Sequence, residues 1–214
     1  SMHHKNHVIK GIEAFPDVGM EQTWIGVSNT AVAALLNNYP EEHPQSKTGS
    51  RGIIVPRLLR MSEPSLGMLE EPNMDLENIN PFRVLLYSIK TQTLVMQVWD
   101  GEQLSKKQTF SEGRVILASS SYGEEIRMAR EKKAIDLLEG VGNVTREGLQ
   151  VFFSTTGEDG YPTSDSPCME AKKSQSVASQ VITVQESIVH ITGYAGPPNI
   201  PEEQHAHMDE IIRV

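Results

Sequence analysis

The sequence lacks a second cysteine. Its single cysteine, Cys168, excludes an intramolecular disulfide and any zinc or iron–sulfur site made of several cysteines. This composition fits a reducing compartment, so we expect the protein to be cytoplasmic. A catalytic cysteine needs a base or positive charge nearby to form its thiolate, and Lys172 and Lys173 follow Cys168 closely. A buried structural cysteine is the commoner outcome, which makes Cys168 a weaker candidate for a nucleophile than for a core residue.

The sequence is also poor in basic charge. It has 19 Lys and Arg residues against 28 Asp and Glu residues, a formal net charge of -9 at pH 7. Phosphate backbones and anionic lipid surfaces are bound through clustered Lys and Arg, so we expect neither nucleic acid nor a membrane surface as a partner.

Long hydrophobic runs are missing as well. The longest, residues 53–55 and 85–87, are far shorter than the roughly 20 apolar residues that span a bilayer, so no membrane span is expected. Residues 1–7 lack the apolar stretch of a signal peptide, and the leading Ser1-Met2 pair is typical of the scar left by a removed affinity tag. The 38% of hydrophobic and 22% of charged residues are ordinary for a packed fold, and 214 residues suffice for one large domain or two small ones.

Short apolar runs separated by turn residues predict three β-hairpins. They lie over residues 24–29 and 31–36, over 82–89 and 93–99, and over 176–184 and 188–194. Residues 103–109 are expected to pair back onto the sheet, and residues 115–118 to form a further strand. Residues 37–49 hold Pro, Asn, Ser and Gly without periodicity and predict an exposed loop.

Apolar residues recur with helical spacing in two segments. These are residues 53–61, where Pro56 falls in the first turn, and residues 124–138, the clearest helix of the chain. A short second helix is predicted over 65–74, and the C-terminal tail is expected to be disordered in part or docked as a short helix. Because strands and helices do not alternate strictly, the pattern predicts an α+β fold rather than a doubly wound one.

Two polar segments next to predicted helices contain candidate site residues. Ser50-Arg51-Gly52 places a hydroxyl at a predicted N-cap and an arginine beside free backbone N–H groups, a corner that can hold a carboxylate or a phosphate. The alternative is that Ser50 only caps the helix and Arg51 ties down the preceding loop. Three serines at 119–121 follow a predicted strand and can line a site, or Ser121 can cap the next helix.

The histidines predict no metal site. They form an N-terminal cluster, a C-terminal pair and two isolated residues, and neither group lies on a convincing helix at i, i+4 spacing beside a carboxylate ligand. The sequence also contains no Gly-rich phosphate-binding loop. We therefore expect neither a metal nor a cofactor.

Seven short motifs follow one another along most of the chain. They are TWIGVS (23–28), ALLNNYP (34–40), SRG (50–52), WDG (99–101), ASSSY (118–122), PCM (167–169) and GPP (196–198). In this order and spacing they resemble the successive landmarks of the NRDE family, which includes the transport and Golgi organization protein 2 group. Each string is weak by itself, whereas their shared order is specific.

The resemblance implies an αββα sandwich of antiparallel sheets, like that of N-terminal-nucleophile hydrolases. Such enzymes cleave amide bonds with a Cys, Ser or Thr at the mature N-terminus, whose own α-amino group takes the proton. Asn37 matches the family asparagine that in related amidases would help to polarise a carbonyl, and the serines at 119–121 fall where another oxyanion-side group would sit. The pocket candidates are Trp24, Asn37, Arg51, Ser119, Ser120 and Ser121.

Two features of the family pattern are missing from the sequence. The pattern starts with Met-Cys and carries Asn-Arg-Asp-Glu soon after, whereas residues 1–22 contain no cysteine and that string occurs nowhere. Three accounts follow: a truncated form, a natural degenerate member that binds a ligand or partner, or a processed Ser1 that is itself the nucleophile. The catalytic residue is therefore unknown, and an active protein would be an amide C–N hydrolase of the N-terminal-nucleophile type.

We accordingly expect a tag scar plus loop over residues 1–22, an NRDE-like domain over 23–198 and a C-terminal tail over 199–214. The fold would lack an N-terminal strand, and the exposed sheet edge would favour a homodimer. The expected function is that of a non-catalytic or truncated relative of amide hydrolases. The alternative is a cytosolic binding or trafficking-related protein that uses the same pocket for a small-molecule ligand or a partner.

Overall fold

The computed structural model divides the chain into two compact units, which are described separately. The first is built mainly from residues up to Val115, and the second mainly from residues 125–213. The structure describes residues 7–9, 12–15, 22–39, 47–111, 115–118, 124–139, 170–171, 174–175, 178–185, 188–195 and 206–213.

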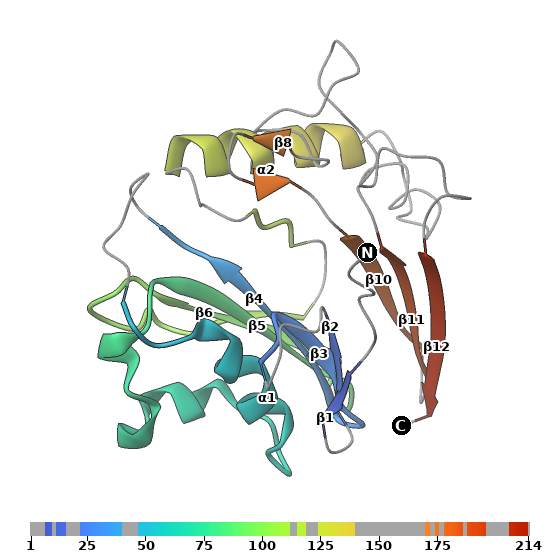
Figure 1. The fold of residues 1–214 in the computed structure, drawn as a ribbon, viewed down its shortest axis with the longest axis horizontal. Helices are drawn as coiled ribbons and strands as arrows, with labels where there is room; N and C mark the ends of the chain where they lie inside the picture. Colours follow the sequence, from blue (N-terminus) through green and yellow to red (C-terminus); the bar gives the residue numbers. More distant parts are fainter. Residues whose placement is uncertain are drawn as a thin grey trace. The chain divides into compact units, whose positions relative to one another are not determined.

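The first unit is organised by a seven-stranded sheet in which each strand pairs antiparallel with the next along the chain (Figure 1). Its strands are β1 (His7–Ile9), β2 (Ile12–Phe15), β3 (Ile25–Val27), β4 (Ala31–Asn37), β5 (Phe82–Ser88), β6 (Thr93–Trp99) and β7 (Gln108–Phe110). The two predicted hairpins are confirmed as β3–β4 and β5–β6, and β7 pairs with β6 as expected.

β1 and β2 lie in the segment for which the sequence predicted a loop. Their short apolar runs pair with each other, and β2 pairs with β3, so the sheet continues beyond the first predicted hairpin. Runs of three and four residues are too short to show a strand period, and only pairing with a neighbour makes them strands.

The connection between β4 and β5 crosses one face of this sheet. It contains η1 (Arg51–Ile53), α1 (Ile54–Leu59), η2 (Leu66–Glu70), η3 (Pro72–Met74) and η4 (Leu76–Asn78). The helix predicted over residues 53–61 is confirmed by α1. The second predicted helix is instead a series of 3-10 turns, because Pro72 offers no backbone N–H and Asp75 takes a left-handed φ of 43°.

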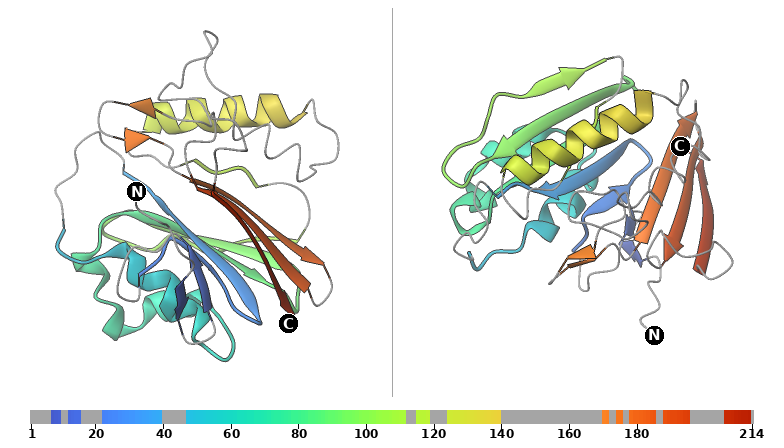
Figure 2. Two further views of the ribbon diagram at one scale, coloured as in Figure 1. Left: turned by 45° about the vertical axis from the view of Figure 1, so that its right-hand side comes forward. Right: turned by 90° about the horizontal axis from the view of Figure 1, so that it is seen from above.

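Alternating residues of β4 and β5 form the core against α1. Figure 2 shows the helical connection lying along one face of the sheet that contains these strands. The members of the core include Ala31, Ala33 and Leu35 of β4, Phe82, Val84 and Leu86 of β5, and Ile54, Val55 and Leu58 of α1. Trp99 closes the core at the end of β6, where its indole Nε1–H donates to the Ile79 carbonyl over 2.9 Å. One face of the sheet is therefore fixed to the helical connection.

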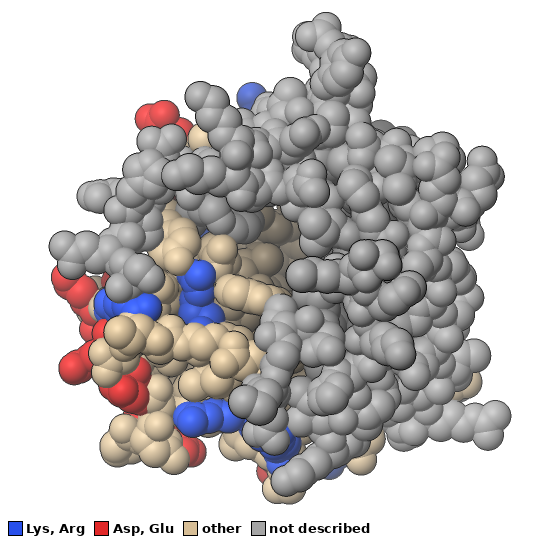
Figure 3. Space-filling model, in the orientation of Figure 1, with Lys and Arg blue, Asp and Glu red and all other residues tan. Residues whose placement is uncertain are grey.

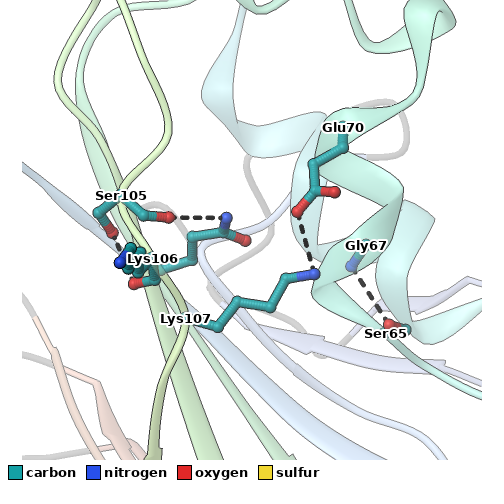
Figure 4. Close-up of polar contacts among 7 residues, drawn as sticks. Ser65, Gly67, Glu70, Ser105, Lys106 and Lys107 are labelled. Atoms are coloured by element: carbon teal, nitrogen blue, oxygen red, sulfur yellow. Dashed lines mark hydrogen bonds and ion pairs between the residues drawn. The ribbon is translucent and has the colours of Figure 1, made fainter.

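The segment between β6 and β7 is held to η2 by an exposed ion pair (Figure 4). Lys107 Nζ lies 3.0 Å from Glu70 Oε1, and this hydrogen bond, with the charge of Lys107, lowers the pKa of Glu70. A lowered carboxylate pKa adds stability above the pKa of the unfolded state, and that stability is lost as the pH falls through the folded value. Because both groups are exposed, the contribution to stability should be small.

Lys107→Gln is expected to raise the pKa of Glu70 towards its ordinary value while leaving the urea unfolding midpoint nearly unchanged. The physical reason is that water screens the lost charge. An NMR pH titration of the Glu70 side chain measures the first quantity. Lys106→Gln is the matched control, since Lys106 is exposed and adjacent, and an equal pKa change in that variant would contradict the assignment to Lys107.

The second unit contains α2 (Glu124–Glu139), the short pair β8 (Glu170–Ala171) and β9 (Ser174–Gln175), and a three-stranded antiparallel sheet. That sheet is formed by β10 (Ala178–Gln185), β11 (Ile188–Ala195) and β12 (Ala206–Arg213). The helix predicted over 124–138 and the hairpin predicted over 176–194 are confirmed. In α2, Arg127 and Glu131 form an i, i+4 ion pair of 2.6 Å.

Two predictions for this unit were wrong. The tail expected to be disordered or helical contains β12, which pairs with β11 over eight residues. Residues 115–118 do not form a strand, and the backbone N–H of Ala118 donates to the Glu131 carboxylate over 3.1 Å. In both places a distant partner, which local sequence does not reveal, decides the conformation. Within the described parts of the chain, no helix is both long and apolar enough to cross a membrane.

Candidate binding site at Arg51

Arg51 is the first residue of η1, and the residue before it forms the cap of this turn. Ser50 Oγ accepts a hydrogen bond from the Gly52 backbone N–H over 3.2 Å and donates to Gln22 Oε1 over 2.7 Å. The capping role that the sequence predicted for Ser50 is therefore present. With its hydroxyl held in this way, Ser50 fixes the direction in which the chain enters η1.

The Arg51 side chain lies against two aromatic rings. Its guanidinium carbon is 5.3 Å from the centre of the Trp24 ring and 4.9 Å from the centre of the Tyr39 ring. Both distances are within the range of cation–π attraction, which favours arginine over lysine because the guanidinium is planar. We call this group of Trp24, Arg51 and Tyr39 the aromatic clamp.

Backbone hydrogen bonds bring the three residues of the clamp together. The Thr23 N–H donates to the Gly52 carbonyl over 2.9 Å, which holds the residue before Trp24 against η1. Next to Tyr39, the Asn38 N–H donates to the Pro81 carbonyl over 3.2 Å. Arg51 Nη1 donates to the same Pro81 oxygen over 3.1 Å. The clamp thus joins the start of β3, the end of β4 and the residue before β5.

Burial lowers the pKa of the Arg51 guanidinium, and Tyr39 opposes this shift. The guanidinium nevertheless stays protonated at any physiological pH, because its ordinary pKa is far above 7. It makes no ion pair with any of the carboxylates in the described ranges. On the face drawn in Figure 3, basic side chains of the described residues lie among uncharged ones, and most of the acidic side chains in view lie toward the left margin.

Asn37 lies at the same end of β4 as the clamp. It is the last residue of the strand, is paired with Phe82, and is half-buried. The next side chain, Asn38, accepts a hydrogen bond from Arg83 Nε over 3.0 Å through its Oδ1, and Arg83 is buried. This corner therefore contains two cationic side chains and two amides.

The structure brings together two of the predicted pocket candidates, Trp24 and Arg51, with Asn37 at the same end of the sheet. Ser119, Ser120, Ser121 and Cys168 lie outside the described residues. Sequence reasoning missed Tyr39 as a site residue, although the motif ALLNNYP (34–40) contains it. Among the described residues, no group of three or more His, Cys, Asp or Glu side chains is arranged to hold a metal ion.

The fold is of the mixed α+β class, and an arginine lies against two aromatic rings at one end of its antiparallel sheet. The chain belongs to the Transport and Golgi organisation 2 (TANGO2) family, whose model matches residues 1–190. This match confirms the resemblance to the NRDE family, and it includes β1 and β2. Among curated proteins, none matches the chain well enough to count as a relative.

Proposed function

We propose that the chain is a non-catalytic relative of the amide C–N hydrolases whose aromatic clamp binds a small molecule carrying a carboxylate. The proposal rests on the surroundings of the Arg51 side chain. Its guanidinium is half-buried and held by two rings, and it forms no ion pair with a carboxylate of the described residues. A half-buried cation attracts an anionic group more strongly than a fully solvated cation does, because the effective dielectric constant around it is lower.

The geometry of the guanidinium suits a carboxylate. Arginine has five N–H donors in a fixed planar arrangement, and Nη1 of Arg51 already donates to the Pro81 carbonyl. The other donors can bind a carboxylate through two parallel hydrogen bonds. Asn37, half-buried at the same strand end, supplies an amide that can recognise a neighbouring polar group of the ligand.

The hydroxyl groups described at this corner support binding rather than catalysis. Ser50 Oγ donates to the amide oxygen of Gln22, and Thr23 Oγ1 donates to the Ile25 carbonyl over 2.7 Å. A nucleophilic hydroxyl must instead pass its proton to a base such as an imidazole or a free amine. Neither amide nor carbonyl oxygen has that basicity.

For the architecture, we propose the αββα sandwich that the resemblance implies. The first sheet supports it because both of its faces are apolar. Ala33 and Leu86 lie on the face packed against α1, while Val32 and Leu85 lie on the other and are half-buried. A sheet with two apolar faces needs a covering layer on each of them.

The two tryptophans of the chain provide a direct test of the clamp. Trp24 lies against Arg51 in the clamp, whereas Trp99 is buried in the core. Their indole N–H signals in an NMR spectrum therefore report on the clamp and on the core separately. Titration with N-acetylglycine, which carries a carboxylate and an amide, is expected to shift the Trp24 signal and not the Trp99 signal. Arg51→Gln is expected to weaken this binding at least about tenfold, because a hydrogen bond to a charged group is lost.

Arg57→Gln is the matched control for this test. It removes an arginine of α1 that lies outside the clamp, and it should leave the titration unchanged. Arg51→Lys should restore only part of the affinity, since a lysine keeps the charge and loses the planar fork. A Trp24 signal that does not respond to the ligand, or responds equally in Arg51→Gln with an unchanged urea midpoint, would show that the clamp only ties the strands together.

A further inference from the structure

A second candidate site lies in the first unit, away from Arg51. It is a hollow of about 350 Å³ beside the C-terminal end of α1, η2 and η3. This volume is at the lower end of the range for small-molecule sites and is too small for a protein element such as a helix.

Three methionines form the apolar part of this hollow. Met68 is 7% exposed and Met74 is 2% exposed, while Met61 is half-buried. Thioether side chains are flexible and polarisable, so they adapt to ligands of different shape. We call these three residues the methionine floor.

The rim of the hollow is polar and carries more positive than negative charge. Arg57 and Arg60 come from the exposed side of α1 and its C-cap, and Glu71 and Asn73 line the other side. Arg57 Nη1 has only neutral acceptors, the Asn73 carbonyl at 3.5 Å and Met74 Sδ at 3.3 Å. Among the described residues, no carboxylate forms an ion pair with Arg57, although Glu71 lines the same hollow.

We propose that this hollow binds a small amphipathic carboxylate, with its apolar body on the methionine floor and its charged group on Arg57. Both contacts of Arg57 are weak, because the Asn73 carbonyl is 3.5 Å away and a thioether sulfur is a poor acceptor, so a carboxylate can replace them at little cost. The apolar body of the ligand itself leaves water when it packs on the methionine floor, which adds the second part of the binding energy. The inference is independent of the function proposed for Arg51, because it uses a different arginine and a different set of contacts.

Decanoate is the probe for this site, and decanol is its uncharged counterpart. Binding to the full chain can be followed by the displacement of a fluorescent apolar sulfonate, anilinonaphthalene sulfonate. Decanoate is expected to displace the dye at a lower concentration than decanol does. Arg57→Gln should weaken decanoate about tenfold and leave decanol unchanged, since only the charged contact is removed.

Lys90→Gln is the control variant for this experiment. Lys90 is exposed in the turn between β5 and β6 and belongs to neither proposed site, so this variant should bind decanoate as the unchanged protein does. Arg57→Lys, which keeps the charge, should retain most of the affinity. Equal binding of decanoate by Arg57→Gln, or equal displacement by decanol and decanoate in the unchanged protein, would overturn the proposal.

Discussion

Phe82→Ala is expected to lower the free energy of unfolding by about 3–5 kcal/mol, the largest single effect that we predict for this chain. Phe82 is fully buried as the first residue of β5, where it is paired with Asn37 on one side and with Trp99 on the other. Removing its ring leaves a cavity in the centre of the core, and the rigid sheet can close this cavity only in part. Urea unfolding followed by circular dichroism measures the change.

Phe110→Ala is the matched control for Phe82. Phe110 is a half-buried residue of β7, the strand at one end of the first sheet, and the same substitution removes the same atoms there. We expect a much smaller loss of unfolding free energy, because the Phe110 ring is partly exposed and its removal gives up less buried apolar surface. Equal losses at the two positions would mean that Phe82 is not at the centre of the core.

Gly49→Ala is expected to cost about 1–3 kcal/mol, the usual range for overpacking a well-filled site. A Cβ atom at Gly49 would lie 2.7 Å from the backbone oxygen of Asn78 and 3.1 Å from a side-chain carbon of Ile79. The backbone oxygen cannot move away easily, because it accepts a hydrogen bond of 2.8 Å from the Gly49 N–H. The two chain segments must therefore separate.

Gly67→Ala provides the comparison for Gly49. The nearest atom to a Cβ at Gly67 is Ser65 Oγ at 3.4 Å, an ordinary contact, so this substitution should be neutral or slightly stabilising. Gly49 directly precedes Ser50 and Arg51, and its substitution should also shift the Trp24 indole signal. A neutral Gly49→Ala would show that the bridge between Gly49 and Ile79 does not form.

The hairpins and the two main helices could be predicted because their patterns are local. In β4, buried and half-buried residues alternate as the apolar run requires, and a turn with Ser28 and Thr30 separates it from β3. Ser50 could be predicted as a cap because a hydroxyl before a helical run accepts a hydrogen bond within two residues. In each case the interacting groups are close in sequence.

β12 and the 3-10 turns could not be predicted in this way. In β12 the alternation of apolar and polar residues is broken at Glu210 and Ile211, so the local pattern does not mark a strand, and the segment is a strand because β11 pairs with it. The turn η2 is apolar enough for a helix, and its residues Leu66, Met68 and Leu69 are buried. The 3-10 conformation follows from Pro72, which has no backbone N–H, and from Asp75, whose backbone is left-handed.

The sequence by itself determined the α+β class, the family and the identity of Trp24 and Arg51 as site candidates, because motifs and periodic patterns are properties of neighbouring residues. Only the tertiary structure decided that Tyr39 completes the clamp and that the carbonyl of Pro81 holds it together. Arg51 and Pro81 are 30 residues apart, and their meeting depends on the pairing of β4 with β5. Contacts across such a separation are set by packing and pairing, which no local pattern encodes.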